Sequence, residues 1–340
     1  MEAVLARPAN KVLPFLGLLL VTGGLLLLGW IAYSVWNPGP APYRYQLVEE
    51  GGADKFAKLG LESWPDLKIG KYELRIEGVD KPVAVAHVAR RGDAAPVMLG
   101  WENRIDEPAI FLDSRPSELA ALTKAIGKYA PKDALVLAWW DTSRQLRLLS
   151  ESKTMFASHL AEPFIVPSVW GAHSGPIGKY ERAFWGASPD AGEQRKFQRF
   201  ADALTGEGES GAATLRELAG GREAYVAVHV SDLYKLGLMR PDRLGVAYKD
   251  FPVKGDMHGP IGFVKRWLRD NKYTAYALHE LDGDQVRVYF LSDAKSGNTL
   301  LAQMLPLTTS SPAELQDVQL VYQHGGYWVY KIPSAQPAGS

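Results

Sequence analysis

A long apolar run near the N-terminus is the strongest hydrophobic pattern in the chain. It covers residues 12–36 (VLPFLGLLLVTGGLLLLGWIAYSVW) and contains no charged side chain. As a helix, about 25 residues with a rise of roughly 1.5 Å each extend about 37 Å, enough to cross a hydrocarbon core of about 30 Å. Trp30, Tyr33 and Trp36 gather at its C-terminal end, where aromatic side chains favour the membrane interface. The pattern predicts a transmembrane helix over residues 12–36 that contacts membrane lipid.

A cleaved signal peptide is the alternative interpretation of this run. Arg7 and Lys11 would form its basic region, and Ala32-Tyr33-Ser34 resembles a small-x-small cleavage site. However, the run is longer than the roughly 7–15 apolar residues of a signal peptide, and bulky Val35 and Trp36 follow the cleavage position. These features favour an uncleaved anchor.

The charges around the run predict its direction. Basic residues precede it within residues 1–11, whereas residues 37–42 after it are uncharged. Under the positive-inside rule, residues 1–11 form a cytoplasmic tail and the rest of the chain is exported. We therefore expect a single-pass protein of a bacterial inner membrane with its bulk in the periplasm.

Beyond the anchor, patterns typical of strands alternate with patterns typical of helices. Residues 37–70 begin with the Pro-rich NPGPAPYR, which predicts an extended stalk, and a short helix is expected near residues 54–61. Strand-like runs occupy residues 71–78, 82–90, 133–141, 223–231, 274–282, 285–293 and 317–332, and helical patterns occupy residues 114–129, 142–149, 176–186, 190–204, 211–219 and 260–271.

Two of the strand-like runs are apolar almost throughout. DALVLAWWD at residues 133–141 and EAYVAVHVS at residues 223–231 lack the polar alternation of a half-exposed strand, which favours strands buried on both faces. Buried strands that alternate with helices predict an α/β fold with a mixed sheet, and the last residues, 334–340, form a polar tail.

The same two runs open an apparent internal repeat. Each leads into a short helix, and each is followed some thirty residues later by a His-containing Gly-Pro-Ile-Gly helix start: HSGPIGKYERAFW at residues 173–185 and HGPIGFVKRWL at residues 258–268. Proline suits the first helical turn, so chance similarity of two helix openings is the alternative. The matched order predicts two duplicated halves, residues 71–206 and residues 207–333.

Composition excludes several classes of protein. The 340 residues contain 38 basic and 38 acidic side chains, so no charge bias indicates a nucleic-acid partner. Hydrophobic residues at 46% and charged residues at 22% are typical of globular proteins. Cysteine is absent, which excludes Cys-ligated haem attachment, iron–sulfur clusters and Cys-ligated metal centres within this chain. We expect a chain without a cofactor of its own and without enzymatic activity.

The end of the first buried run contains the strongest candidate for ligand binding. Trp139, Trp140, Asp141 and Arg144 lie where a parallel strand would end, and α/β sheets place ligands at that edge. The carboxylate could accept hydrogen bonds or hold a cation, and the tryptophans could stack on a ring. The structural alternative is that Asp141 caps the following helix while the tryptophans fill the core.

The histidines show no spacing typical of a metal site. There is no H-x-x-x-H, H-E-x-x-H or H-x-H pattern among the seven histidines, so the sequence predicts no metal centre. If the duplicated halves face one another, His173 and His258 could meet, with His229 or Asp141 nearby. The sequence also contains no nucleophile elbow, phosphate-binding loop or dinucleotide fingerprint.

The Trp139-Trp140-Asp141 triplet resembles the WWD-type signature of membrane oligosaccharyltransferases. In those enzymes the motif belongs to a soluble domain that follows many membrane spans, whereas this chain has one predicted span. The resemblance therefore implies at most glycan or small-ligand binding, which is the alternative function.

The layout as a whole resembles the hydroxylamine-oxidation protein B (HaoB) family. The likeness rests on the single N-terminal span, AWWDTSRQLRLLS at residues 138–150, the segment WGAHSGPI at residues 170–177 with ERAFW, and DMHGPIGFVKRW at residues 256–267. It implies a membrane-anchored periplasmic accessory that tethers or organises a multihaem hydroxylamine oxidoreductase, or another redox protein at the membrane. No catalytic residue carries over from this resemblance.

Overall fold

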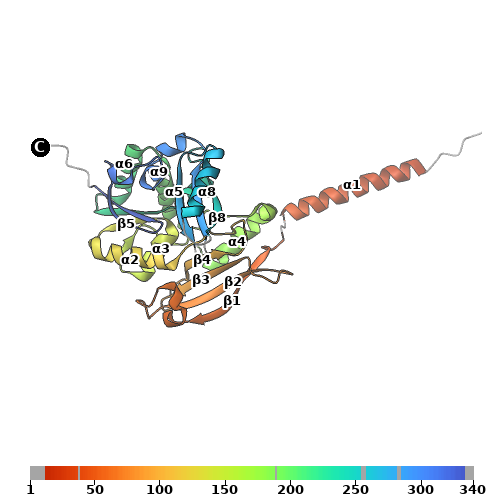
Figure 1. Cartoon of the computed structure of the whole chain (residues 1–340). Coiled ribbons are helices and arrows are strands. Elements are labelled where there is room, and N and C mark those ends of the chain that lie inside the picture. Colours follow the sequence, from red (N-terminus) through yellow and green to blue (C-terminus); the bar gives the residue numbers. More distant parts are fainter. Residues whose placement is uncertain (1–11, 37–38, 188–189, 254–257, 282–284, 334–340) are drawn as a thin grey trace, which may run out of the picture.

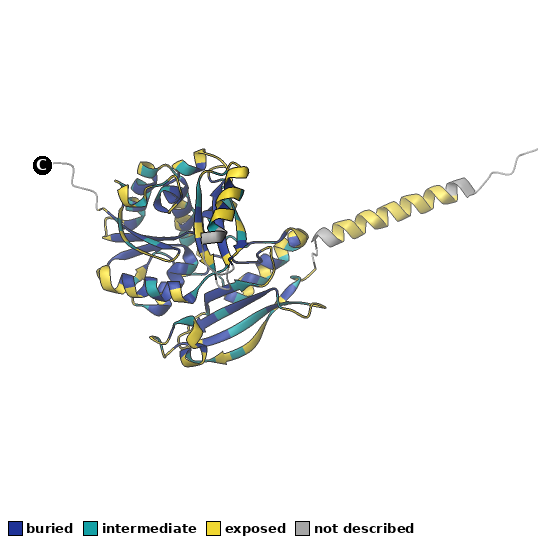
Figure 2. Cartoon of the chain, viewed as in Figure 1, coloured by how far each residue is buried: buried dark blue, intermediate teal, exposed yellow. Residues whose placement is uncertain are grey.

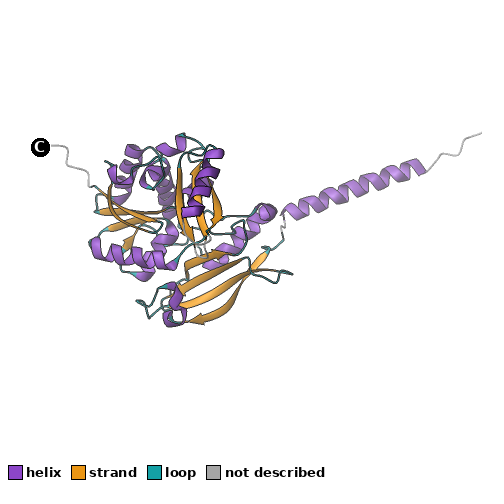
Figure 3. Cartoon of the chain, viewed as in Figure 1, coloured by secondary structure: helices purple, strands orange, loops and turns teal. Residues whose placement is uncertain are grey.

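The computed structural model describes residues 12–36, 39–187, 190–253, 258–281 and 285–333. Within these ranges, the side chains of residues 12–14, 34–36 and 258–260 are not described. Three β-sheets and their covering helices form the folded part of the chain (Figure 3). The predicted α/β fold class is confirmed.

Helix α1 spans Val12–Trp36, as the apolar pattern predicts. It extends away from the folded part, and its described side chains are exposed (Figures 1 and 2). The stretch Phe15–Tyr33 has a mean hydropathy of 2.2, so its length and composition suit a membrane span. The same features also fit a signal sequence, and Ala32-Tyr33-Ser34 lies within the helix.

The first sheet after α1 is antiparallel. It consists of β1 (Tyr43–Gly51), β2 (Lys68–Ile76), β3 (Ala84–Arg90) and β4 (Val97–Asn103), in that order. A 3-10 helix, η1 (Ala53–Leu59), connects the first two strands near the predicted short helix. Strand β1 lies within the segment that the Pro-rich pattern assigned to a stalk. It joins the sheet because Tyr43 packs inward and is only 4% exposed.

The central sheet contains the two apolar runs. Its order is β11 (Gln319–His324), β12 (Tyr327–Ile332), β7 (Ala224–His229), β5 (Leu135–Ala138) and β6 (Lys153–Thr154). Strands β5 and β7 are parallel neighbours, and both are fully buried. The predicted strand at residues 133–141 ends earlier, at Ala138, because a helix starts at Trp140.

Both faces of the central sheet are covered, which explains why β5 and β7 lack polar alternation. Val136 and Ala138 pack against α2 (Pro116–Tyr129) and α3 (Trp140–Leu149). Leu135 and Leu137 point into the larger core on the opposite face, which contains residues of α5 (Ala191–Thr205), α6 (Gly208–Ala219) and α9 (Leu300–Met304).

The third sheet is also antiparallel. Its order is β8 (Val246–Pro252), β10 (Gln285–Leu291) and β9 (Tyr276–Leu281). Helix α8 (His258–Asp270) covers the face that carries Val286, Val288 and Phe290. The intervening residues of β10, among them Arg287, therefore face the other way.

The remaining elements connect these sheets. Helix α4 (Ser174–Trp185) packs on β1, and α7 (Asp232–Met239) follows β7. The short 3-10 helices are η2 (Ser168–His173), η3 (Lys295–Asn298) and η4 (Pro312–Glu314).

The two segments of the apparent repeat thus give a parallel strand followed by a helix in each case, and the Gly-Pro-Ile-Gly motifs lie in the first turns of α4 and α8. The proposed boundary at residues 206–207 falls between α5 and α6, which share one core. Duplication and the division into halves stay predictions.

Candidate functional site

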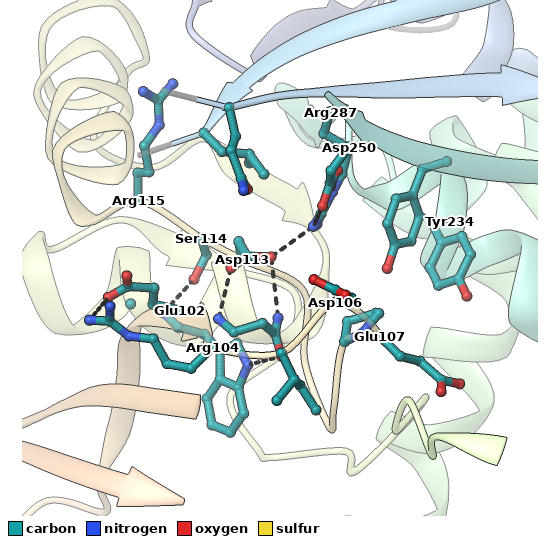
Figure 4. A pocket seen from close by; sticks show the side chains of 18 of the residues that line it. Glu102, Arg104, Asp106, Glu107, Asp113, Ser114, Arg115, Tyr234, Asp250 and Arg287 are labelled. Atoms are coloured by element: carbon teal, nitrogen blue, oxygen red, sulfur yellow. Dashed lines mark hydrogen bonds and ion pairs between the residues drawn. The ribbon is translucent and has the colours of Figure 1, made fainter. Parts of the chain in front are cut away.

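A polar cleft lies between the first and third sheets (Figure 4). Its volume is about 980 Å³. One wall is β4 with the loop at residues 103–116, and the other is formed by β8 and β10 on the face that carries Arg287. Charged side chains of both signs line it: Glu102, Arg104, Asp106, Glu107, Asp113, Arg115, Lys249, Asp250 and Arg287.

A row of polar side chains crosses the third sheet at this cleft. Asp250 of β8 and His279 of β9 are both directly opposite Arg287 of β10. The guanidinium of Arg287 donates from Nε and Nη2 to the two carboxylate oxygens of Asp250, each at 2.7 Å. It also lies over the ring of Tyr248, at 4.3 Å from the centroid.

Arg287 also joins the two walls of the cleft. Its Nη2 donates to Asp113 Oδ2 at 2.9 Å, and Asp113 in turn accepts from the backbone and side chain of Asn103 (Figure 4). Burial alone would lower the pKa of Arg287, but the hydrogen bonds to Asp250 and the nearby negative groups raise it well above its usual range. The cleft therefore contains a guanidinium that stays charged and is paired with two carboxylates.

The rim of the cleft is more exposed. Arg104 pairs with Glu102 at 2.8 Å, and the side chain of Asp106 points into solvent. Glu107 accepts a hydrogen bond from the backbone of Ser168 at 3.1 Å. Such a lining suits a polar or charged ligand, or a polar segment of another protein, better than an apolar small molecule.

Next to the cleft, a buried cluster joins three distant parts of the chain. Glu118 lies in the first turn of α2, His229 ends β7 and His279 lies in β9. Nε2 of His229 is 3.2 Å from Glu118 Oε2, and Nε2 of His279 is 3.4 Å from both carboxylate oxygens. Arg115, which lines the cleft, forms an ion pair with Glu118 Oε1.

The protonation of this cluster follows from its contacts. Burial alone would raise the pKa of Glu118, but the hydrogen bonds with His229 and His279 outweigh it and bring the pKa well below its usual range. Burial lowers the pKa of His279. Near neutral pH, the cluster therefore holds a carboxylate beside a neutral His279 imidazole.

The β11–β12 turn closes over the cluster. The backbone N–H of Gly326 donates to Glu118 Oε2 at 3.2 Å. A Cβ at Gly326 would lie 2.1 Å from His229 Nε2, and one at Gly325 would lie 2.5 Å from Glu118 Oε1. Gly325 also has a φ of 55°. Both positions thus require glycine, because a side chain would displace the cluster.

Of the predicted site residues, His229 and Asp141 both lie at the carboxyl edge of the parallel strands. Asp232 accepts from the backbone N–H of His229 at 2.8 Å, and Lys235 bridges Asp232 at 3.1 Å and Asp141 at 3.6 Å. Burial alone would lower the pKa of Lys235, but the two carboxylates raise it. Asp232 and Lys235 thus link His229 to Asp141 at this edge of the sheet.

The other members of the Trp-Trp-Asp strand end are in the core. Trp139 and Trp140 are 1% and 2% exposed, and Arg144 donates to the carbonyl of Pro96 at 2.8 Å. The cavity beside Trp140, Asp141 and Arg144 has a volume of only about 10 Å³, which is room for about one water. The tryptophans fill the core, as in the structural alternative, but Asp141 does not cap α3: the N-cap is Trp139, and Asp141 lies in the first turn.

The remaining predicted histidines are elsewhere. His173 ends η2 and precedes α4, and its Nδ1 is buried without a hydrogen-bond partner in the described structure. His258 begins α8, and its side chain lies outside the described residues. None of the described contacts of His229 involves His173; its partners include Glu118, Ser231 and His279.

Sequence reasoning missed Glu118, His279 and Arg287. Glu118 lies within the helical pattern at residues 114–129, and His279 and Arg287 lie within the strand patterns at residues 274–282 and 285–293. The available signals were the polar residues within otherwise apolar β9 and β10 and the paired glycines of the β11–β12 turn. No local spacing connects positions that are 111 and 161 residues apart.

A second buried carboxylate lies near the end of α1. Glu181 of α4 is fully buried and accepts hydrogen bonds from the Tyr43 hydroxyl at 2.6 Å, the Tyr45 hydroxyl at 3.0 Å and Trp185 Nε1 at 2.8 Å. Burial raises its pKa to about 7, despite these three donors. This cluster fastens β1 to α4 on the part of the fold that leads to α1 (Figure 1).

Comparison with known proteins gives likenesses to solved structures and one family. The C-terminal domain of PglB from C. jejuni is similar with a TM-score of 0.36 and 12% identity, over 63% of this chain and 99% of that one. No curated protein matches.

The family comparison covers nearly the whole chain. The model of the family described as HaoA-associated protein HaoB matches residues 9–332, which include α1 and all three sheets. HaoA is the hydroxylamine oxidoreductase, so the family name places these proteins beside that enzyme. The chain belongs to the HaoA-associated protein HaoB family.

Proposed function

We propose that this chain is a membrane-anchored periplasmic accessory protein that tethers hydroxylamine oxidoreductase to the membrane surface. The observation that carries the proposal is the family match over residues 9–332, because it includes the exposed apolar helix and the folded part together.

The charges and composition of the chain agree with this proposal. Arg7 and Lys11 precede α1, which favours a cytoplasmic N-terminus and export of the folded part. The chain has no cysteine, so it lacks the ligands for haem attachment and iron–sulfur clusters. The partner would accordingly supply the redox centres, while this chain would hold the partner at the membrane.

We place the contact with the oxidoreductase at the polar cleft. This cavity has the size and the mixed charge that a polar loop of a partner requires, and Arg104 and Asp106 on its rim are exposed. A contact of this kind weakens as ionic strength rises, because charges at a rim are screened by salt.

The tethering can be tested by cell fractionation. Cells that express the oxidoreductase would carry either the full chain or a variant in which a cleavable signal peptide replaces residues 12–36. The oxidoreductase is expected in the membrane fraction with the full chain and in the soluble periplasmic fraction with the variant. Equal membrane association in both strains would overturn the tethering function.

The docking surface can be tested by charge reversal. Arg104→Glu and Asp106→Lys are expected to reduce co-purification of the oxidoreductase with the detergent-solubilised chain. Glu217→Lys on α6, where the side chain is 68% exposed, is the matched control and should leave it unchanged. Loss in the control alone, or no loss in either cleft variant, would remove the cleft from the interface.

A further inference from the structure

The buried cluster of Glu118, His229 and His279 has no part in tethering. Its three side chains come from α2, β7 and β9, and each is at most 6% exposed. We propose that this cluster is a binding site for one divalent transition-metal ion of the zinc and ferrous-iron class.

The spacing of the three side chains suits a shared ion. One potential ligand atom from each side chain lies within 4.8 Å of the other two, and the closest nitrogen-to-oxygen separations are 3.2 and 3.4 Å. Ligands placed about 2.1 Å from a tetrahedral ion are themselves about 3.4 Å apart. The side chains therefore need little movement to bind one ion together.

The donor set also selects the class of ion. Two imidazoles and one carboxylate form the ligand set of hydrolytic zinc sites and of non-haem ferrous sites. Calcium and magnesium favour sites built from oxygen ligands, so the two histidines argue against them.

The surroundings hold the ligands in place. Nδ1 of His229 is 2.7 Å from Ser231 Oγ and accepts from the backbone N–H of Ser231 at 3.2 Å, and these two contacts fix the orientation of the ring. His279 makes its described side-chain hydrogen bonds only through Nε2, toward Glu118. The polar contacts of both rings thus direct their Nε2 atoms to one point beside the carboxylate.

Arg115 connects this point to the cleft. It lines the cleft and pairs with Glu118 Oε1, and its side chain is 22% exposed. A guanidinium and a divalent ion compete for the same carboxylate. Arg115 is therefore the side chain that must move for an ion to enter from the cleft, and its removal should strengthen metal binding.

A purely structural cluster makes the opposite prediction. In that case Arg115 neutralises Glu118, and the histidines only complete the hydrogen bonding of the carboxylate. Loss of Arg115 would then lower stability without creating affinity for any ion. The two roles can thus be separated by a variant that leaves all three proposed ligands intact.

The experiment uses the full chain, purified in detergent with a tag that contains no histidine and treated with a chelator. Titration with Co²⁺, followed by its visible absorption, should show one ion per chain, and Zn²⁺ should displace it. Glu118→Gln, His229→Asn and His279→Asn should each weaken binding on the order of 100-fold. His324→Asn, an exposed histidine on β11, is the matched control and should bind as the wild type does.

Arg115→Gln keeps the test decisive if a ligand variant fails to fold. This variant should bind Co²⁺ several-fold more tightly than the wild type does. Zn²⁺ should also raise the melting temperature of the variant more than that of the wild type. The metal site is refuted if the wild type and Arg115→Gln bind no stoichiometric ion. It is equally refuted if folded ligand variants bind as well as the wild type, or if His324→Asn abolishes binding.

Discussion

Two buried glutamates of this chain are similarly enclosed but have pKa shifts of opposite sign. Glu118 is 4% exposed and Glu181 is 0% exposed, and both accept several hydrogen bonds. The pKa of Glu118 lies well below its usual range, whereas the pKa of Glu181 is raised to about 7. Burial therefore does not by itself determine the charge of a carboxyl group.

The difference comes from the chemistry of the donors. Burial raises the pKa at both sites, and at Glu181 the donors are two phenols and an indole, which remain neutral. At Glu118 the hydrogen bonds with His229 and His279 outweigh burial, and the Arg115 guanidinium is a charged partner of the same carboxylate. Three phenol and indole donors thus leave a buried carboxyl group poised near neutrality, whereas the contacts with the two imidazoles hold Glu118 ionised.

The largest expected effect is the loss of the Glu118 carboxylate. Glu118→Ala leaves Arg115, His229 and His279 without their shared partner, and breaking a buried pair costs about 3–5 kcal/mol of unfolding free energy. Urea unfolding of the detergent-solubilised chain with a chelator present, followed by tryptophan fluorescence, measures this loss. Glu118→Gln keeps an acceptor and should lose less. A loss below about 1 kcal/mol in the alanine variant would show that the cluster does not hold the three elements together.

The next largest effect is a pH dependence of the unfolding free energy that comes from Glu181. Its pKa is raised from 4.5 when unfolded to about 7 when folded, so it stabilises the folded state below pH 4.5, and this contribution disappears as the pH rises through 7. The difference corresponds to about 3 kcal/mol. Glu181→Gln stays neutral and should lack this slope. If the unfolding free energies of the wild type and Glu181→Gln changed in parallel from pH 4.5 to pH 8, the raised pKa of Glu181 would be contradicted.

The helices and strands show how far the sequence predicts the fold. The apolar patterns located α1, β5, β7 and the β9–β10 pair, because continuous or alternating hydrophobicity is a local property. They placed the end of β5 too late, since Trp139 and Trp140 are buried at the start of a helix as they would be in a strand. Strand β1 was missed because a Pro-rich stretch directly precedes Tyr43.

The candidate site was far less predictable. The sequence indicates His229 only as a neighbour of His173 and His258, whereas its contacts with Glu118 and His279 depend on how α2 and β9 pack on the central sheet. Glu118 is 161 residues from His279, and neither carries a motif. The close approach of Gly325 and Gly326 to this cluster depends on the same tertiary contacts, so no local pattern connects the two glycines with it.

A smaller pH dependence of the unfolding free energy is expected at His159, and its direction is opposite to that at Glu181. Its ring stacks on Trp185, the indole that donates to Glu181, and its Nδ1 accepts from the backbone of Ala161 at 3.1 Å. Burial, with Arg144 nearby, lowers its pKa from 6.5 to about 3, so its contribution is present above pH 6.5 and is lost as the pH falls.

Between pH 6.5 and pH 5 the loss amounts to about 2 kcal/mol. His159→Asn retains an acceptor for Ala161 and does not titrate in this range. The difference in unfolding free energy between the wild type and this variant should therefore shrink by that amount as the pH falls over this window. A constant difference would mean that the buried histidine is protonated as easily in the folded state as in the unfolded chain.

The smallest effect is expected at a third glutamate, which is exposed. Glu217 of α6 pairs with Arg199 at 2.7 Å, but its side chain is 68% exposed and that of Arg199 is 54% exposed. Exposed ion pairs contribute roughly 0–1 kcal/mol because water and salt screen them, so Glu217→Gln should change the unfolding free energy by less than about 0.5 kcal/mol. If this variant instead lost more than about 1 kcal/mol, a single surface contact would equal a buried one, and burial could no longer explain the size of the effects at Glu118 and Glu181.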